Sequence, residues 1–245
     1  MSVIVQKYGG SSLSDVSNIA NVADRICKSK DKGFNLVVVV SAMGNSTDQL
    51  VELARSITDE PDARELDALL ATGEIISCSL LAITLKDLGY DAVSLTGYQV
   101  GVHTDDVYGN ARINLIDQGR IGKELSDGRI VVIAGFQGIT DDLNTTTLGR
   151  GGSDTTAVAL AAVLNADRCE VYTDVEGIYT ADPRIVLGAR KIREIGYEDM
   201  LELASIGAKM HPRSIELGAV YHVPKYVASS FTNVIAVSYT HLTLP

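Results

Sequence analysis

The chain has 245 residues, which is enough for one large domain or two small ones. Apolar residues make up 46% of it and charged residues 21%, the ordinary proportions of a globular protein. The formal net charge of −10 argues against a general nucleic-acid-binding protein, and an anionic ligand would need local cations.

The cysteines and the apolar runs indicate the cellular compartment in which we expect the protein. Cys27, Cys78 and Cys169 lie far apart, without metal-ligand spacing or the framework of a disulfide-rich protein, which predicts the reducing cytoplasm. We expect no signal peptide, because a strand begins near Val3. Uncharged runs such as 75–85 are shorter than the ~18 residues that a membrane span needs.

The first predicted strand, residues 3–7, runs into a glycine turn at 9–10. Apolar residues then recur at helical spacing over 16–27, with Ser14 as the predicted N-cap. A strand, a glycine turn and a helix make the geometry of a phosphate site, and Lys7 is placed to reach the same phosphates. The glycine spacings of a P-loop and of a dinucleotide fold are absent, and a plain tight turn stays open as the alternative.

A second predicted strand, residues 36–40, is a β-branched run typical of a strand buried on both faces of a parallel sheet. Small polar residues follow it at 41–47, which is where α/β folds bind ligands. A plain connecting loop is the alternative at this position.

Residues 62–88 show a helical pattern that we expect to be broken at 72–74. Glu74 lies there among apolar neighbours, and a buried carboxylate is costly unless it is paired. A bound ammonium group would be a suitable partner. The alternative is that Glu74 caps a second helix.

Two further strands are predicted at 91–95 and 129–134. Residues 97–112 between them are polar and irregular, and we expect them either to cover the site or to form a contact surface. A polar loop at 141–147 then leads into the most informative stretch of the chain.

That stretch is 149–156, Gly-Arg-Gly-Gly-Ser-Asp-Thr-Thr, which precedes an alanine-rich helix at 157–166. Its glycines let the backbone approach a ligand, and Ser153 or Asp154 is the predicted N-cap. The free N–H groups of the helix start and the planar fork of Arg150 favour a carboxylate or phosphate. Asp154 would repel that anion unless it faces a cation such as Mg²⁺ or an ammonium group. An ordinary capped helix is the alternative.

A strand at 169–173 is followed by a loop at 174–184 with acids, a tyrosine, a proline and an arginine. This mixture would suit a purine and a ribose, with Arg184 turned towards phosphate, and a surface turn is the alternative. We predict a helix at 197–208. We also predict an edge strand at 223–229, because its proline removes a backbone donor.

Strands that alternate with helices predict an α/β fold, a three-layer αβα sandwich around a mainly parallel sheet. The loops of the candidate site all follow strand ends. We therefore expect them to converge on one edge of the sheet.

In their order and spacing, five runs of this sequence together resemble the kinase domain of the aspartokinases, in the amino acid kinase superfamily. The runs are 7–12, 41–43, 73–74, 149–156 and 173–184. The resemblance covers residues 2–231 and implies the amino acid kinase fold. It also implies ATP-dependent phosphorylation of the side-chain carboxylate of L-aspartate to 4-phospho-L-aspartate, the first step towards lysine, methionine and threonine.

The resemblance also implies site residues, cofactors and partners. The catalytic residues would be Lys7 and Asp154. The ATP contacts would be Lys7, Tyr8, Gly9, Gly10, Thr173, Asp174, Tyr179, Asp182, Arg184 and Lys209. The substrate contacts would be Ser41, Thr47, Glu74, Arg150, Gly151, Gly152 and Ser153. The cofactors would be ATP and Mg²⁺ without a dedicated protein metal site, and the partners L-aspartate and ATP, with no nucleic acid and no membrane.

The residues fit this chemistry. Glu74 would hold the ammonium group of aspartate, and Arg150 would grip its α-carboxylate. The remaining carboxylate is already an anion, so it needs no general base. Its difficulty is repulsion from the triphosphate, which alignment and the cations Lys7, Lys209 and Mg²⁺ would offset. Two alternatives stay open: a related kinase acting on another carboxylate substrate, and a nucleotide-binding regulatory subunit without turnover.

Two features depart from the family pattern. In 207–213, one residue stands where the family has two before His-Pro-Arg, and one deleted residue rotates a helix by about 100°, which puts the role of Lys209 in question. Residues 233–245 do not continue the family sequence. We therefore expect a catalytic domain over 1–232 and an atypical tail that reflects truncation or an artefact. The family's two ACT domains are absent from this sequence, which predicts weaker feedback control and a weakened homo-oligomer.

Overall fold

The computed structural model describes residues 2–181, 185–205, 210–232 and the backbone of 237–240. The strands are β1 (Val3–Tyr8), β2 (Asn35–Val40), β3 (Ala92–Leu95), β4 (Val102–Thr104), β5 (Ile113–Ile116), β6 (Ile130–Ala134), β7 (Gln137–Ile139), β8 (Thr145–Thr147), β9 (Arg168–Thr173), β10 (Glu194–Gly196), β11 (Lys225–Ser229) and β12 (Val237–Thr240). The helices are α1 (Val16–Lys30), α2 (Ser46–Arg55), α3 (Ala63–Asp87), α4 (Gly119–Ser126), α5 (Gly152–Val163), α6 (Tyr197–Ser205) and α7 (Pro212–Val220), with a short 3-10 helix, η1 (Gly10–Leu13).

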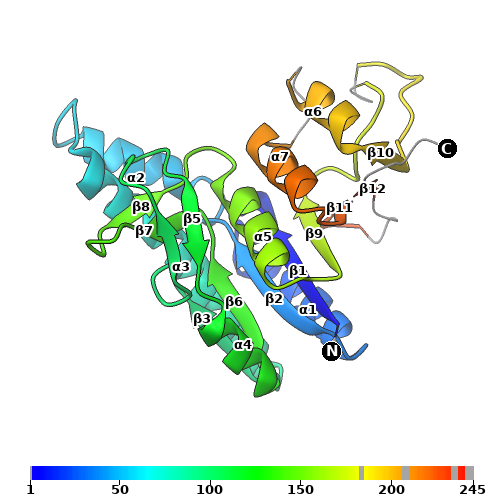
Figure 1. Cartoon of the computed structure of the whole chain (residues 1–245), viewed down its shortest axis with the longest axis horizontal. Helices are drawn as coiled ribbons and strands as arrows, with labels where there is room; N and C mark the ends of the chain where they lie inside the picture. The colour runs from blue at the N-terminus through cyan, green and yellow to red at the C-terminus, as the bar shows by residue number, and fades with distance from the viewer. Residues whose placement is uncertain (1, 182–184, 206–209, 233–236, 241–245) are drawn as a thin grey trace.

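A large sheet forms the middle layer of the molecule (Figure 1). Its strand order is β10-β12-β11-β9-β1-β2-β6-β3, and neighbouring strands run parallel except β11 and β12. β1 lies near its centre, where Lys7 is in register with Val39 of β2 and Val171 of β9. The expected mainly parallel sheet is confirmed.

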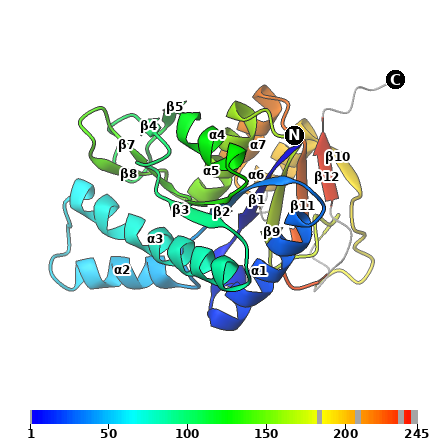
Figure 2. The ribbon, with the colours of Figure 1, turned by 90° about the horizontal axis from the view of Figure 1, so that it is seen from below.

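Helices cover both faces of this sheet. Figure 2 shows α1 and α3 below the strands and α4, α5 and α7 above them. Alternate residues of a strand point to opposite faces, so β1 contributes to two cores. Val5 packs in the core that contains Leu160 of α5, whereas Ile4 packs in the core that contains Ile19 of α1 and Leu81 of α3. The three-layer sandwich is therefore confirmed.

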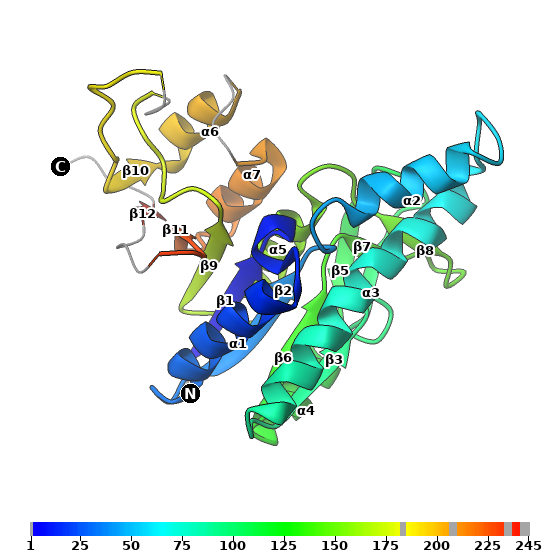
Figure 3. The same cartoon turned by 180° about the vertical axis from the view of Figure 1, so that it is seen from behind.

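A second, smaller sheet has the order β5-β4-β7-β8. It lies beyond one end of the large sheet, beside α2 and the start of α3 (Figures 1 and 3). β8 packs against α3. It leads directly into the Gly149–Thr156 stretch, so this sheet supports one wall of the candidate site.

The expected break at 72–74 is wrong, because α3 runs unbroken for 25 residues. Gly73 is there for close packing: a Cβ on it would lie 2.9 Å from Cβ of Ala42. Glu74 is therefore inside the helix and caps nothing. Among the described residues, α3 is also long and apolar enough to span a membrane, although the uncharged runs alone did not indicate this. Half of the most apolar part of the helix is buried within the chain.

Helix starts differ from the predicted caps. α5 begins at Gly152 with Gly151 as its N-cap, so Ser153 and Asp154 lie in the first turn and the predicted capping role is wrong. α1 is capped by Asp15, whose carboxylate accepts a hydrogen bond from the backbone N–H of Asn18 at 2.9 Å, and not by Ser14. The cap of α1 is one residue after the predicted one, and the cap of α5 is two residues before Ser153.

The C-terminal part corrects a further prediction. β11 is not an edge strand, because it lies between β9 and β12. Pro224 lies just before β11, so its missing N–H removes no hydrogen bond from the strand. Its carbonyl accepts a hydrogen bond from the N–H of Cys169 at 2.8 Å. α6 occupies 197–205 of the predicted helix, while 206–209 lie outside the described residues. The backbone of 237–240, within the expected tail, forms β12.

Candidate active site

The candidate site is organised around an ion pair between the central strand and α5. Lys7 Nζ lies 3.0 Å from Asp154 Oδ1, and the two side chains are 10% and 16% exposed. Lys7 points to this face because Val5, two residues earlier on β1, also faces α5. The ion pair therefore joins the sheet to the first turn of the helix.

The charge state of Asp154 follows from its neighbours. Burial alone would raise its pKa, but the positive charges of Lys7 and Lys225 outweigh that effect, and the pKa lies below its ordinary value. Asp154 is therefore a carboxylate at neutral pH. The cation that the sequence led us to expect beside it is the ammonium group of Lys7.

The glycine turn after β1 passes close to Lys7 and to the loop after β2. A Cβ on Gly9 would lie 3.5 Å from Lys7 Nζ, and a Cβ on Gly10 would lie 2.7 Å from the carbonyl oxygen of Ala42. The N–H of Gly44 donates to the carbonyl of Gly10 at 3.0 Å. Only glycine fits at position 10 without moving this backbone.

Tyr8 lies on the opposite face of β1. Its ring is fully buried and stacks on Tyr172, with the ring centroids 4.9 Å apart. A contact from Tyr8 to a nucleotide would therefore have to come from its backbone.

Glu74 approaches the same loop from α3. Its Oε1 accepts a hydrogen bond from the N–H of Ala42 at 3.0 Å, while its Oε2 is buried and has no partner among the described residues. Burial raises the pKa of Glu74 to about 7, and the hydrogen bond from Ala42 opposes that rise only in part. A buried carboxylate oxygen without a donor fits a ligand that brings an ammonium group.

Two other predicted substrate contacts lie along this loop. Ser41 follows β2 directly and is partly buried, and its carbonyl accepts from the hydroxyl of Ser77 on α3 at 2.7 Å. Thr47 is partly buried in the first turn of α2. Both residues therefore lie at the carboxyl end of β2, as predicted.

The Gly149–Asp154 stretch leads into the first turn of α5, where Asp154 pairs with Lys7. Gly151 has a left-handed backbone with φ of 69°, and a Cβ on it would lie 2.3 Å from Cβ of His211. A Cβ on Gly152 would lie 2.8 Å from the ring of Phe136. The glycines therefore allow close packing by protein groups, a reason that the sequence did not reveal.

Ser153 and Arg150 face different surroundings. Ser153 is buried beside Gly135, on which a Cβ would lie 2.9 Å from Cβ of Ser153. Arg150 is exposed, and no acid among the described residues lies within ion-pair distance of it. Its guanidinium group is therefore available to a ligand.

The predicted nucleotide contacts are brought together in part. Thr173 ends β9, and its hydroxyl lies 3.1 Å from Oδ1 of the exposed Asp174. The carbonyl of Tyr172 accepts from the N–H of Gly9 at 3.2 Å, so the end of β9 lies against the glycine turn. Tyr179 is partly buried, and its hydroxyl donates to Glu176 at 3.4 Å. Asp182, Arg184 and Lys209 lie outside the described residues.

Comparison with known proteins shows to which family the chain belongs. Residues 2–229 match the Amino acid kinase family. The chain belongs to this family. Among curated proteins, Aspartokinase 2 of Bacillus subtilis (strain 168) is 56% identical over 231 residues, which are 94% of this chain and 57% of the relative. The aspartokinase of Geobacillus stearothermophilus is 55% identical over 95% of this chain and 58% of the relative.

Solved structures agree with this assignment. Aspartate kinase from Synechocystis superposes with a TM-score of 0.88 at 48% identity and covers 99% of this chain and 40% of that one. E. coli aspartokinase III in complex with aspartate and ADP gives a TM-score of 0.89 at 27% identity, over 99% of this chain and 65% of that one. This amino acid kinase spans somewhat more than half the length of the curated relatives given above.

Two residues that support the site of this amino acid kinase escaped the sequence reasoning. Asp67 is 1% exposed, and its carboxylate accepts from the N–H of Gly109 at 2.9 Å and from both the N–H and the hydroxyl of Thr147 at 2.7 Å. Arg213 donates to the carbonyl of Leu148 at 2.8 Å. Together they hold the segment that leads into the glycine stretch. Asp67 lies two helical turns before Glu74 on the same face, a spacing that could have revealed it.

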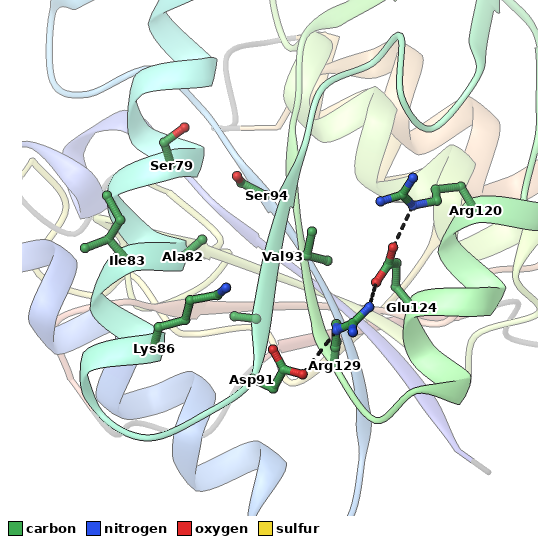
Figure 4. A pocket seen from close by; sticks show the side chains of 11 residues that line it. Ser79, Ala82, Ile83, Lys86, Asp91, Val93, Ser94, Arg120, Glu124 and Arg129 are labelled. Atoms are coloured by element: carbon green, nitrogen blue, oxygen red, sulfur yellow. Dashed lines mark hydrogen bonds and ion pairs between the residues drawn. The ribbon is translucent and has the colours of Figure 1, made fainter.

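Two hollows lined by described residues of the amino acid kinase lie elsewhere, and Lys7 lines neither of them. One, of about 510 Å³, lies at the edge strand β3 between α3 and α4 (Figure 4). There Glu124 pairs with Arg120 and Arg129, and Arg129 pairs with Asp91. The other, of about 440 Å³, lies beside α1 and β9. The chemical groups described above, and not these two hollows, locate the candidate site.

Proposed function

We propose that this amino acid kinase transfers the γ-phosphoryl group of ATP to the side-chain carboxylate of L-aspartate, giving 4-phospho-L-aspartate and ADP. The observation that carries this proposal is the Lys7–Asp154 ion pair, together with Glu74 of α3, whose buried Oε2 has no partner among the described residues. The curated relatives that bear the name aspartokinase support it, as does the solved relative that holds aspartate and ADP.

Glu74 and Arg150 distinguish the two ends of the amino acid. The substrate ammonium group pairs with Glu74 Oε2, which has no donor among the described residues. The α-carboxylate accepts two hydrogen bonds from the exposed guanidinium group of Arg150. The hydroxyls of Ser41, Thr47 and Ser153 and the N–H group of Gly151 complete the substrate contacts. Gly152 borders them, and its own N–H donates to the carbonyl of Gly149 at 3.0 Å. The side-chain carboxylate then faces the phosphates.

The nucleotide occupies the other side of Lys7. Lys7 and the N–H group of Gly10 contact its phosphates. Gly9, whose own N–H donates to Tyr172, has no side chain and lets the phosphates approach Lys7 Nζ closely. Thr173, Asp174 and Tyr179 follow β9 and contact the nucleoside, together with Asp182, Arg184 and Lys209, which lie outside the described residues.

Electrostatics and alignment supply the catalysis. The acceptor carboxylate is already ionised, so the reaction needs no general base, and its barrier includes repulsion from the triphosphate. Lys7 offsets that repulsion and stabilises the charge that develops in phosphoryl transfer. Asp154, ionised and 3.0 Å away, fixes the ammonium group of Lys7 at the site.

Mg²⁺ accompanies the nucleotide in this proposal. No group of three or more metal-ligating side chains lies together within the described ranges. In this proposal the ion is held chiefly by the phosphates, with Asp154 as the nearby carboxylate. When bound, the ion neutralises phosphate charge. We further propose a cytoplasmic location, in which the buried thiols of Cys27, Cys78 and Cys169 stay reduced, as they are in this structure.

A substrate panel tests the proposal. ADP release from Mg-ATP is measured with L-aspartate, with L-glutamate and without an acceptor, and ADP binding is measured by calorimetry. We expect turnover that depends on aspartate. Faster turnover with glutamate would indicate the related-kinase alternative. ADP binding without turnover on any acceptor would indicate a nucleotide-binding subunit and overturn the proposal.

A further inference from the structure

Lys225 is a fully buried lysine that none of the roles above uses. It lies on β11, in register with Cys169 of β9, and is 0% exposed. Its Nζ lies 3.0 Å from the hydroxyl of Ser214, which is also 0% exposed. Taking an ammonium group out of water costs several kcal/mol unless charges or hydrogen bonds compensate. A lysine in the centre of a core face therefore needs a reason beyond packing.

One reason is its charge. Lys225 and Lys7 lie on the same face of the sheet, because Val227, two residues after Lys225, is in register with Val171, which is in register with Lys7. Burial lowers the pKa of Lys225, and the carboxylate of Asp154 on α5 opposes that effect; Cys169 on β9 and Lys7 on β1 are among the other titratable groups that act on it. Asp154 in turn faces Lys7, Lys225 and His211. Asp154 thus forms its ion pair with Lys7 and is also acted on by the charge of Lys225.

A second reason is the start of α7. The hydroxyl of Ser214 donates to the carbonyl of His211 at 2.9 Å. His211 packs against Gly151 so closely that a Cβ there would lie 2.3 Å away. Arg213, one residue before Ser214, donates to the carbonyl of Leu148 at 2.8 Å. Lys225 therefore anchors the segment that rests on the Gly149–Asp154 turn.

We propose that Lys225 is a positioning residue for the phosphoryl-transfer site. Its ammonium group orients Asp154, and through Asp154 it sets the place of Lys7 at the phosphates. Through Ser214 it also holds His211 against the glycine turn. The second buried cation adds positive potential where the triphosphate and the acceptor carboxylate meet. The inference rests on the proposed function for its effect on rate, but its contacts are independent of it.

Lys225→Met tests this, because methionine fills similar space without the charge. We expect kcat to fall about tenfold, as when a residue that orients a reacting group is lost, with the aspartate KM within about twofold of wild type. We expect the melting temperature to stay equal or rise, because an apolar side chain no longer pays the desolvation of a buried charge. A purely structural lysine would instead lower the melting temperature and move the aspartate KM.

Lys86→Met is the matched control. Lys86 is exposed at the β3 edge, so this variant changes the net charge equally and should keep the wild-type kcat. Ser214→Ala keeps the charge of Lys225 and removes its anchor, and we expect about a threefold loss of kcat, the effect of losing one ordinary hydrogen bond. A normal kcat in Lys225→Met would overturn the proposal.

A double-mutant cycle tests the link to Asp154 without any assay of activity. Asp154→Asn leaves Lys7 and Lys225 buried together, so we expect it to lower the folding equilibrium constant at least about fivefold more in wild type than in Lys225→Met. Affinity for Mg-free ADP should also fall severalfold in Lys225→Met. Additive effects and unchanged ADP affinity would refute the positioning role. If wild type binds ADP but turns over no acceptor, the proposed function is wrong. The double-mutant cycle and the ADP affinity would then still test the positioning role of Lys225.

Discussion

At the scale of single residues, the pair of Lys7 and Asp154 carries most of the proposed chemistry. Sequence reasoning reached Lys7, because a lysine at the end of a strand before a glycine turn lies near a helix start. It also recognised that Asp154 needs a cation. It could not identify Lys225 as part of the same cluster. That requires the register of β11 against β9, in which Lys225 pairs with Cys169, a residue far from it in the chain.

Removing the charge of Lys7 should affect the transition state most. For Lys7→Ala we expect kcat to fall by ~10²–10³-fold, the scale for losing one electrostatic donor at a site of phosphoryl or acyl transfer. Steady-state kinetics with varied aspartate and ATP measures this, with Lys86→Ala as the control for an exposed lysine. A kcat close to wild type would remove Lys7 from this role.

Glu74 should make aspartate binding depend on pH. Its pKa is about 7 in the free chain, so ionisation, and with it binding of the ammonium group, increases as the pH rises through neutrality. We expect the aspartate KM to fall over that range in wild type. In Glu74→Gln we expect a higher KM without this pH dependence and an unchanged ATP KM. Equal damage to the ATP KM would favour a structural role for Glu74.

The same pKa has a consequence for stability. The folded-state pKa of Glu74 is raised above the ordinary value of 4.5, so the folded chain holds this proton more tightly than the unfolded chain does. The associated stability is present below pH 4.5 and is lost as the pH rises through about 7. Glu74→Gln should therefore gain up to roughly 3 kcal/mol relative to wild type at alkaline pH, as measured by denaturant unfolding. A constant difference across pH would contradict a buried, titrating Glu74.

At the scale of elements, long apolar strands were predictable and short ones were not. The runs at 3–7, 36–40 and 129–134 became β1, β2 and β6, because β-branched residues buried on both faces leave an unambiguous pattern. β10 has three residues and β12 four, too few for a periodic signal. The Thr-Gly-Glu run within α3 resembles a helix break in the sequence. The sequence does not show that Ala42 packs against Gly73, which explains the glycine inside a continuous helix.

Asp67 joins three elements and should matter to all of them. It connects α3 to β8 through Thr147 and to the loop before β5 through Gly109. Asp67→Asn replaces one acceptor oxygen by a donor that faces these N–H groups. We expect a loss of roughly 1–3 kcal/mol in unfolding free energy and a raised aspartate KM. Asp87→Asn, exposed at the other end of α3, is the control, and equal effects of the two variants would refute this role.

At the scale of the whole molecule, three layers protect every thiol of the chain. Cys27, Cys78 and Cys169 are 8%, 2% and 0% exposed, and burial raises the pKa of Cys78 and of Cys169 to about 12. A thiol reagent should therefore leave the native chain unmodified at neutral pH and label all three positions after unfolding. Rapid labelling of any cysteine in the native state would show that the layers open around it.

Whole-molecule topology also explains how distant motifs meet. The carboxyl ends of β1, β2 and β9 lie side by side because these strands are parallel neighbours. Lys7, the loop at 41–47 and the loop after Thr173 therefore converge, as their positions after predicted strands indicated. The part played by α3 and α7 was not predictable, since helices reach a site only through the packing of the complete fold.

The most direct measurement is the identity of the product trapped by hydroxylamine. The purified chain is incubated with Mg-ATP, L-aspartate and hydroxylamine, and the hydroxamate is identified by mass spectrometry and NMR. Phosphorylation of the side-chain carboxylate predicts aspartate β-hydroxamate, formed with one ADP, and strongly reduced formation by Lys7→Ala. An α-hydroxamate, or ADP binding without any hydroxamate, would contradict the assignment of this site to the side-chain carboxylate of aspartate.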